Sequence, residues 1–172
     1  MNAFNKLIFL LILLMSNLGI SFSEDFFETR NVATKLDTPW EILWGPDDYI
    51  WMTERYGRVS RVNSVTGELF ELITINDVFE SGERGLMGMA LHPNFNVNPF
   101  VYVVYNTGNT DANTRIKIVR YTYSNNKLID PNIIIENIKG WWNHNGSRLW
   151  IDEDLKLWFT IGDAASSGLA QD

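Results

Sequence analysis

The sequence of 172 residues predicts an all-β fold built from repeated four-stranded sheets. Three observations favour this fold class. Short runs of branched and aromatic residues are separated by Gly, Asn, Asp and Pro, a pattern typical of strands. Helical periodicity is weak beyond residue 24. A strand–turn–strand pattern also recurs with a spacing of about fifty residues, which indicates an internal repeat.

The first and third copies of the repeat are the most similar. Residues 42–53 and 149–160 share aliphatic, Asp, aliphatic, Trp and Thr positions at an offset of 107. A looser copy, residues 89–104, lies between them. We expect the matching Trp51 and Trp158 to be core residues. Outer strands are predicted at 59–62 and 69–73 in the first copy, and at 116–123 and 132–135 in the second.

Four strands per repeat are typical of β-propeller blades, and a solenoid of β-arches is the alternative. The chain holds two blades and the start of a third, whereas propellers close with four to eight. Since an unclosed ring leaves an exposed strand edge, we interpret residues 24–172 as the incomplete N-terminal part of a propeller domain.

The N-terminus predicts export from the cytoplasm. Lys6 precedes an apolar core at 7–15, and Ser21-Phe-Ser23 offers small residues where a signal peptidase cleaves. The apolar stretch is shorter than the about 20 residues of a spanning helix. We expect residues 1–23 to be a signal peptide and the mature chain to be periplasmic or secreted, without a membrane span; an uncleaved anchor is the alternative.

Composition excludes several classes of function. The net charge of −7 argues against nucleic acid as a partner, because phosphate binding needs a basic surface. The absence of cysteine excludes disulfides, iron–sulfur clusters and thiolate zinc sites. With only His92 and His144 in the chain, His-rich metal catalysis is not expected. His92, in Leu-His-Pro-Asn, is expected to brace a turn.

The repeat predicts a site at one end of the propeller channel. Residues just before the first strand of a blade and just after its second strand lie at the same channel mouth. Polar residues converging there mark a default binding site: Glu54, Arg55, Glu83, Arg84, His144, Asn145 and Asp163. His144 with Asp163 has the sharpest chemistry, because a carboxylate on one imidazole nitrogen orients the other as a general base. A solvated loop histidine beside a turn aspartate is the alternative.

Six motifs then follow one another in a characteristic order. They are Pro39-Trp-Glu-Ile42, Thr53-Glu-Arg-Tyr-Gly-Arg58, GERGLMGMALHPNF at 82–95, Val101-Tyr-Val-Val-Tyr105, His144-Asn-Gly-Ser-Arg-Leu149 and Thr160-Ile-Gly-Asp163. Together they resemble the N-terminal part of the soluble glucose/sorbosone dehydrogenase family, also called aldose sugar dehydrogenases. The resemblance implies a secreted six-bladed propeller that binds pyrroloquinoline quinone and Ca²⁺ at the channel mouth and oxidises sugars, passing electrons to an external acceptor.

The resemblance also implies roles for the mouth residues. His144 matches the family's general base and Asp163 its supporting acid. Glu83 stands where the best-known relatives have a cofactor-contacting glutamine, and a carboxylate beside an anionic cofactor needs a nearby cation, which Arg84 would supply. Asn145 and Gln171 are the remaining candidates for cofactor contact. The calcium ligands are implied to lie in later blades, so no metal ligand is assigned here and this chain alone is expected to be inactive.

Two other functions remain open. One is a non-catalytic ligand-binding propeller of the same fold, because fold does not dictate function. The other is a calcium-dependent lactone hydrolase, whose chemistry would depend on mouth carboxylates such as Glu54.

Overall fold

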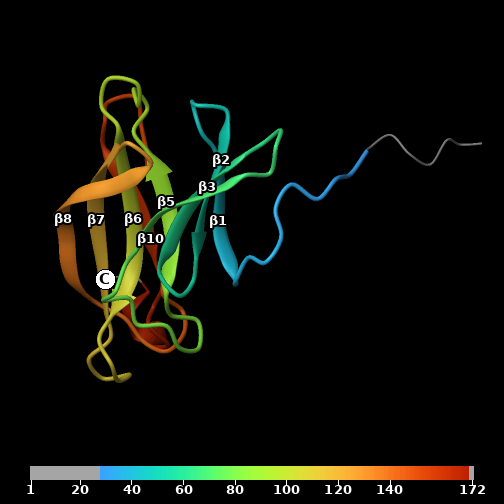
Figure 1. The fold of residues 1–172 in the computed structure, drawn as a ribbon. Helices are drawn as coiled ribbons and strands as arrows, with labels where there is room; N and C mark the ends of the chain where they lie inside the picture. Colours follow the sequence, from blue (N-terminus) through green and yellow to red (C-terminus); the bar gives the residue numbers. More distant parts are fainter. Residues whose placement is uncertain (1–27, 171–172) are drawn as a thin grey trace, which may run out of the picture. The chain divides into compact units, whose positions relative to one another are not determined.

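Three antiparallel sheets follow one another along the chain in the computed structural model, which describes residues 28–170 (Figure 1). All strands belong to one compact unit, Val32–Asp172. Residues 28–31 belong to a separate unit, Met1–Asn31, and carry no regular secondary structure. The predicted signal peptide, residues 1–23, lies outside the described residues.

Each of the first two sheets is a four-stranded meander, as the repeat predicted. The first has the order β1-β2-β3-β4 and the second β5-β6-β7-β8, with each strand antiparallel to its neighbours. The first comprises β1 (Pro39–Trp44), β2 (Tyr49–Glu54), β3 (Arg58–Asn63) and β4 (Leu69–Thr74). The second comprises β5 (Leu86–Leu91), β6 (Phe100–Thr107), β7 (Arg115–Ser124) and β8 (Lys127–Lys139).

The third sheet consists of β9 (Gly146–Ile151) and β10 (Leu157–Ile161), followed by a 3-10 turn, Ser167–Leu169. The described chain thus forms two four-stranded units and the first hairpin of a third. The innermost strands β1 and β9 both contact β5. Three equivalent strands therefore lie in a row, as expected for the wall of a propeller channel.

The middle sheet is covered on both faces, which explains its continuous runs of branched residues. On one face, Val103 packs in a cluster with Trp51 and Leu72 of the first sheet. On the other, Val104 packs in a cluster with Leu149 of β9. Adjacent residues on a strand point to opposite faces, so two apolar residues in succession predict a sheet buried on both sides.

The matching tryptophans have different environments. Trp51 is fully buried and meets Phe95 edge-on at 5.5 Å between ring centroids. Trp158 is 56% exposed, so the expectation that it is a core residue is wrong for the described structure. Within residues 28–170 no sheet follows the third one, and the face of β10 that corresponds to the buried face of β2 stays open.

The hairpin turns confirm the predicted role of His92 and correct the alignment of Asp47 with the third copy of the repeat. His92 Nδ1 accepts a hydrogen bond from the Asn94 backbone N–H at 3.1 Å, so this histidine braces its turn as predicted. The Trp51 indole donates to Asp47 at 2.9 Å, whereas the Trp158 indole donates to Asp152 at 2.7 Å. The structural counterpart of Asp47 is therefore Asp152, two residues earlier than the sequence offset places it.

Candidate active site

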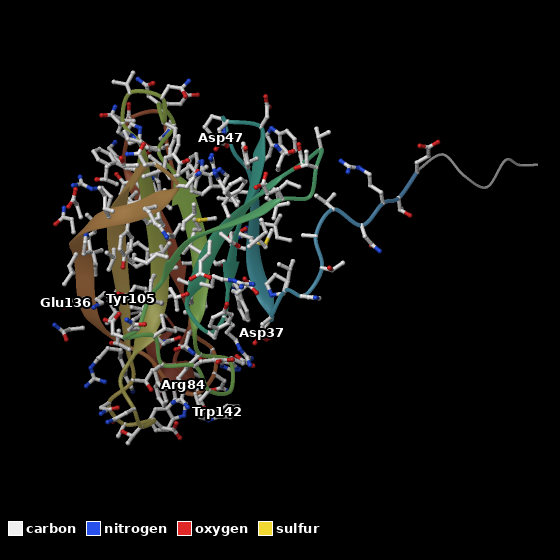
Figure 2. All side chains as sticks on the ribbon, in the orientation of Figure 1. Asp37, Asp47, Arg84, Tyr105, Glu136 and Trp142 are labelled. Atoms are coloured by element: carbon white, nitrogen blue, oxygen red, sulfur yellow. The ribbon has the colours of Figure 1, made fainter. Side chains whose placement is uncertain are left out.

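The segments that precede the innermost strands share one end of the sheets. Arg84, before β5, and Trp142, before β9, lie together at this end, whereas Asp47, in the turn between β1 and β2, lies at the opposite end (Figure 2). The backbone of Glu83 donates to the Trp142 carbonyl at 2.9 Å, which joins the second and third segments directly. The segments that carry Glu83 and His144 therefore lie at the same end of the sheets.

His144 and Asp163 form the pair that the sequence predicts. His144 Nδ1 lies 2.9 Å from Asp163 Oδ1, and the same oxygen accepts the Ala165 backbone N–H at 3.0 Å. An ionised carboxylate only accepts hydrogen bonds, so Nδ1 donates to it, and in the neutral imidazole the lone pair is then on Nε2. The His144 side chain is 56% exposed, which leaves the imidazole open to a molecule at the entrance.

The backbone around His144 is tightly constrained. His144 has a positive φ of 53°, an uncommon conformation for a residue with a side chain. A Cβ on Gly162 would overlap the His144 carbonyl oxygen, so only glycine allows β10 to end this close to the histidine. The same carbonyl accepts the Ala164 N–H at 3.3 Å.

Glu83 contacts the histidine loop. Its Oε2 accepts the backbone N–H of His144 at 2.9 Å. Sequence reasoning placed this side chain near a cofactor and gave no reason to expect a bond to His144. The missing signal is the conformation of the loop at 141–145, which depends on contacts between two blades.

Arg84 and Asn145 are buried, with partners inside the protein. The Arg84 guanidinium donates to Asp111 at 2.6 Å and to Thr114 at 3.0 Å, and it lies over the Phe79 ring. Its charge is thus paired with Asp111 rather than with Glu83. Cofactor contact by Arg84 stays a prediction.

The Asn145 side chain binds the backbone at the other end of the loop that carries His144. It accepts the Trp141 N–H at 3.1 Å and donates to the Trp141 carbonyl at 2.9 Å. Its Oδ1 also accepts a hydrogen bond from Asn106 at 3.1 Å. Contact with a cofactor stays a prediction for Asn145, and Gln171 lies outside the described residues.

The remaining mouth residues from the first sheet are held by ion pairs. Glu54 is fully buried and pairs with Arg58, and this hydrogen bond raises the pKa of Arg58. A lactone hydrolase that depends on Glu54 would therefore lack an accessible carboxylate at this position. Arg55 is partly exposed; it pairs with Glu80 and donates to the Gly82 carbonyl at 2.9 Å.

Sequence reasoning missed an ion pair on the channel wall. Arg148, on β9, donates through Nη1 to both carboxylate oxygens of Glu41, on β1, at 2.8 and 3.0 Å. Glu41 is buried, whereas the Arg148 side chain is 70% exposed. A small hollow of about 210 Å³ is lined by this pair together with Trp40, Gly146, Ser147 and Thr160. The sequence held a signal for this pair, because Glu41 and Arg148 have opposite charges and are separated by the repeat offset of 107.

A second, larger hollow lies away from His144. It measures about 480 Å³ and lies among the ends of β1, β5 and β9 near His92, with Trp44, Leu91 and Trp150 in its walls. We place the candidate site at His144 rather than here, because the hollow lacks the histidine–carboxylate pair. In residues 28–170, no group of three or more His, Asp and Glu side chains is arranged to hold a metal. No helix in that range is long and apolar enough to cross a membrane.

Antiparallel blades around a shared wall, with a histidine–aspartate pair at one entrance, define a β-propeller with an enzyme-like site. Residues 36–172 match the family model described as Glucose / Sorbosone dehydrogenase, and the chain belongs to this family.

Individual relatives agree with this assignment. The chain is 34% identical over 154 residues to quinoprotein glucose dehydrogenase B of Acinetobacter calcoaceticus, covering 84% of this chain and 32% of the relative. It is 27% identical over 143 residues to aldose sugar dehydrogenase YliI of Escherichia coli K12, covering 80% and 38%. The chain thus spans about a third of the length of these curated relatives.

Solved structures share the fold. The PQQ-bound aldose sugar dehydrogenase of Streptomyces coelicolor superposes with a TM-score of 0.75 at 31% identity, covering 83% of this chain and 43% of that one. Apo aldose sugar dehydrogenase of Escherichia coli gives a TM-score of 0.72 at 25% identity, with the same coverage. The prediction of an all-β chain from a propeller family is confirmed.

Proposed function

We propose that this chain supplies the catalytic base of an aldose sugar dehydrogenase that uses pyrroloquinoline quinone. The observation that carries the proposal is the contact of His144 Nδ1 with Asp163 on a half-exposed imidazole, which in its neutral form offers the Nε2 lone pair. Membership of the family supports the reaction class.

The residues at the entrance fit part of what such a cofactor requires. An imidazole that Asp163 holds at Nδ1 and that is half-exposed is present at His144. On the channel wall, Arg148 of β9 is an exposed cation that Glu41 holds by one nitrogen, Nη1. A guanidinium of this kind suits a carboxylate of the cofactor. Calcium stays a proposal without ligands among the described residues.

The protein's part in the reaction is proton removal and orientation. His144 Nε2 takes the proton of the sugar hydroxyl, and Asp163 stabilises the imidazolium that results. The backbone contacts of His144 hold the ring at the entrance, so the base needs little rearrangement. Pyrroloquinoline quinone, when bound, supplies the two-electron acceptor for the hydride of the sugar carbon.

We also propose the setting in which the protein acts. The predicted signal peptide at 1–23 supports a periplasmic or secreted protein. In that compartment the protein would have an external electron acceptor as one partner. The sugar is the second partner of the reaction.

The test uses the full-length protein reconstituted with the quinone and Ca²⁺. Reduction of a redox dye is followed with a panel of aldoses. The His144→Ala substitution is expected to lower kcat by about 10² to 10⁴, the usual contribution of general base catalysis. Undiminished turnover in this variant would remove the assigned base.

A non-catalytic propeller of the same fold is the second candidate. The exposed carboxylate of Glu83 favours it, because this charge opposes an anionic cofactor at the same entrance. In that case, titration with the quinone would produce no change in its absorbance, and substitution of His144 would leave ligand binding as it was.

A further inference from the structure

We propose that Glu83 is a positioning residue for His144, and that it acts by holding the loop at 142–144 rather than by contact with the cofactor. The inference rests on the proposed function, because it assigns His144 the role of the base. It goes beyond that function in naming a residue from another blade that sets where the base lies.

Glu83 binds the histidine loop at two points. Its backbone N–H donates to the Trp142 carbonyl at 2.9 Å, and its Oε2 accepts the His144 N–H at 2.9 Å. One residue of the second blade thus satisfies a carbonyl and an N–H that lie two residues apart in the third blade. Such a two-point contact fixes both the position and the rotation of the intervening backbone.

The neighbouring glycine makes this approach feasible. Gly82 has a φ of 61°, and a Cβ there would lie 2.8 Å from the Trp142 carbonyl oxygen. A side chain at this position would push the two segments apart. Gly82 also accepts a hydrogen bond from Arg55 at 2.9 Å, so the first blade steadies the segment that carries Glu83.

The backbone of His144 needs this support. Its φ of 53° is disfavoured for a residue with a Cβ, and such conformations persist only where the surroundings fix them. The Asn145 side chain braces the loop at Trp141, and Gly162 packs against the His144 carbonyl. Glu83 supplies the acceptor for the remaining backbone group of His144, its N–H.

The Glu83 carboxylate is both a hydrogen-bond acceptor and a negative charge, and substitution can separate the two. Glutamine at position 83 keeps an oxygen that accepts the His144 N–H, and it removes the charge. Alanine removes both. A positioning role therefore predicts that Glu83→Gln rescues most of what Glu83→Ala loses.

The experiment compares Glu83→Ala, Glu83→Gln and the control Glu136→Ala in the full-length protein. Glu136 is an exposed carboxylate on the outermost strand β8, at the outer edge of the second sheet (Figure 2). The readouts are kcat and KM, the quinone Kd from absorbance titration, and ¹⁵N NMR of the His144 ring in the cofactor-free protein. The His144 signals are assigned by their loss in His144→Ala.

Glu83→Ala is expected to lower kcat by about tenfold or more, with a quinone Kd within about threefold of the parent. Its His144 ring is expected to lose the Nδ1–H signature, because the bond to Asp163 requires the present loop position. Glu83→Gln is expected to restore this signature and most of kcat. Glu136→Ala is expected to match the parent in every readout.

Two results would overturn the inference. One is a quinone Kd weakened by about tenfold or more in Glu83→Ala with kcat retained at saturating quinone, which would make Glu83 a cofactor contact. The other is an unchanged His144 ring signature in Glu83→Ala. If the parent protein oxidises no sugar, the proposed function fails, and the NMR comparison still decides whether Glu83 positions His144.

Discussion

Glu41 and Arg148 occupy the same position of the repeat in the first and third blades, and their side chains form an ion pair. Gly88 is at the matching position of β5, which lies between β1 and β9. This follows from the equivalent register pairs Leu43↔Trp51, Ala90↔Tyr102 and Trp150↔Trp158 in the three blades. A Cβ on Gly88 would overlap the Ser147 carbonyl oxygen. The absent side chain lets β9 approach β5, and Arg148 reaches across to Glu41.

Removal of Arg148 is therefore expected to destabilise the protein. Arg148→Met leaves the buried Glu41 carboxylate without its cation. We expect the free energy of unfolding to fall by about 1–2 kcal/mol, less than for a fully buried pair because Arg148 is largely exposed. Urea unfolding of the full-length protein measures the change.

The control for this prediction is the exposed pair Lys156–Asp154. Lys156→Met is expected to change the free energy of unfolding by less than about 0.5 kcal/mol, as is usual for surface pairs. Equal effects of the two substitutions would show that the channel-wall pair contributes no more than a surface contact.

Asp163 is expected to matter for the rate more than for stability. Asp163→Ala removes the acceptor that holds the His144 tautomer, and we expect kcat to fall by about 10². The bond to the Ala165 N–H is lost as well, so a thermal melt accompanies the assay. A fall in kcat that is fully matched by loss of folded protein would contradict a role in catalysis.

The repeat predicted the strands well because their pattern depends on local rules. Alternation and turn residues determine where strands begin and end, so the prediction for 59–62 is close to the observed β3. β8 is longer than expected: the predicted 132–135 is the middle of Lys127–Lys139. Its bulged register with β7 has no simple two-residue period, which hid the ends from a pattern search.

The sequence predicted which residues lie at the entrance better than it predicted their contacts. The order of strands brings Glu83, Arg84 and His144 to one end, whichever way their side chains turn. Their directions depend on loop backbones, such as the positive φ of His144, and on partners from other blades. That is why the sequence placed the charge of Arg84 beside Glu83, whereas the structure pairs it with Asp111.

Alkaline pH is expected to destabilise the protein through a buried tyrosine. Tyr105 is buried and donates to Asp77 at 3.2 Å, and burial raises the pKa of Tyr105. Because the folded pKa lies above the unfolded value of about 10, the stabilisation is complete below pH ~10 and is lost as pH rises toward the folded value. The free energy of unfolding should fall by up to about 1.4 kcal/mol per pH unit in that window.

Tyr105→Phe tests this pH dependence. The variant should lose part of the slope above pH ~10, whereas Tyr102→Phe, on the same strand, is the control. The measurement is urea unfolding at a series of alkaline pH values. A slope unchanged by Tyr105→Phe would assign the alkaline loss of stability to other groups, among them Tyr121, whose pKa burial also raises.

Gly162 and Gly168, which both follow β10, are expected to differ in how alanine substitution affects kcat. A Cβ at Gly162 would overlap the His144 carbonyl, whereas one at Gly168 has open space. Gly162→Ala must displace the histidine from Asp163 or shift the end of β10, and we expect kcat to fall by about tenfold or more. Gly168→Ala is expected to keep the parent's kcat. The two variants are compared by sugar-dependent dye reduction, and the quinone Kd is measured for each. Equal kcat values would mean that the backbone of His144 tolerates displacement and that the base does not require the tight packing at Gly162.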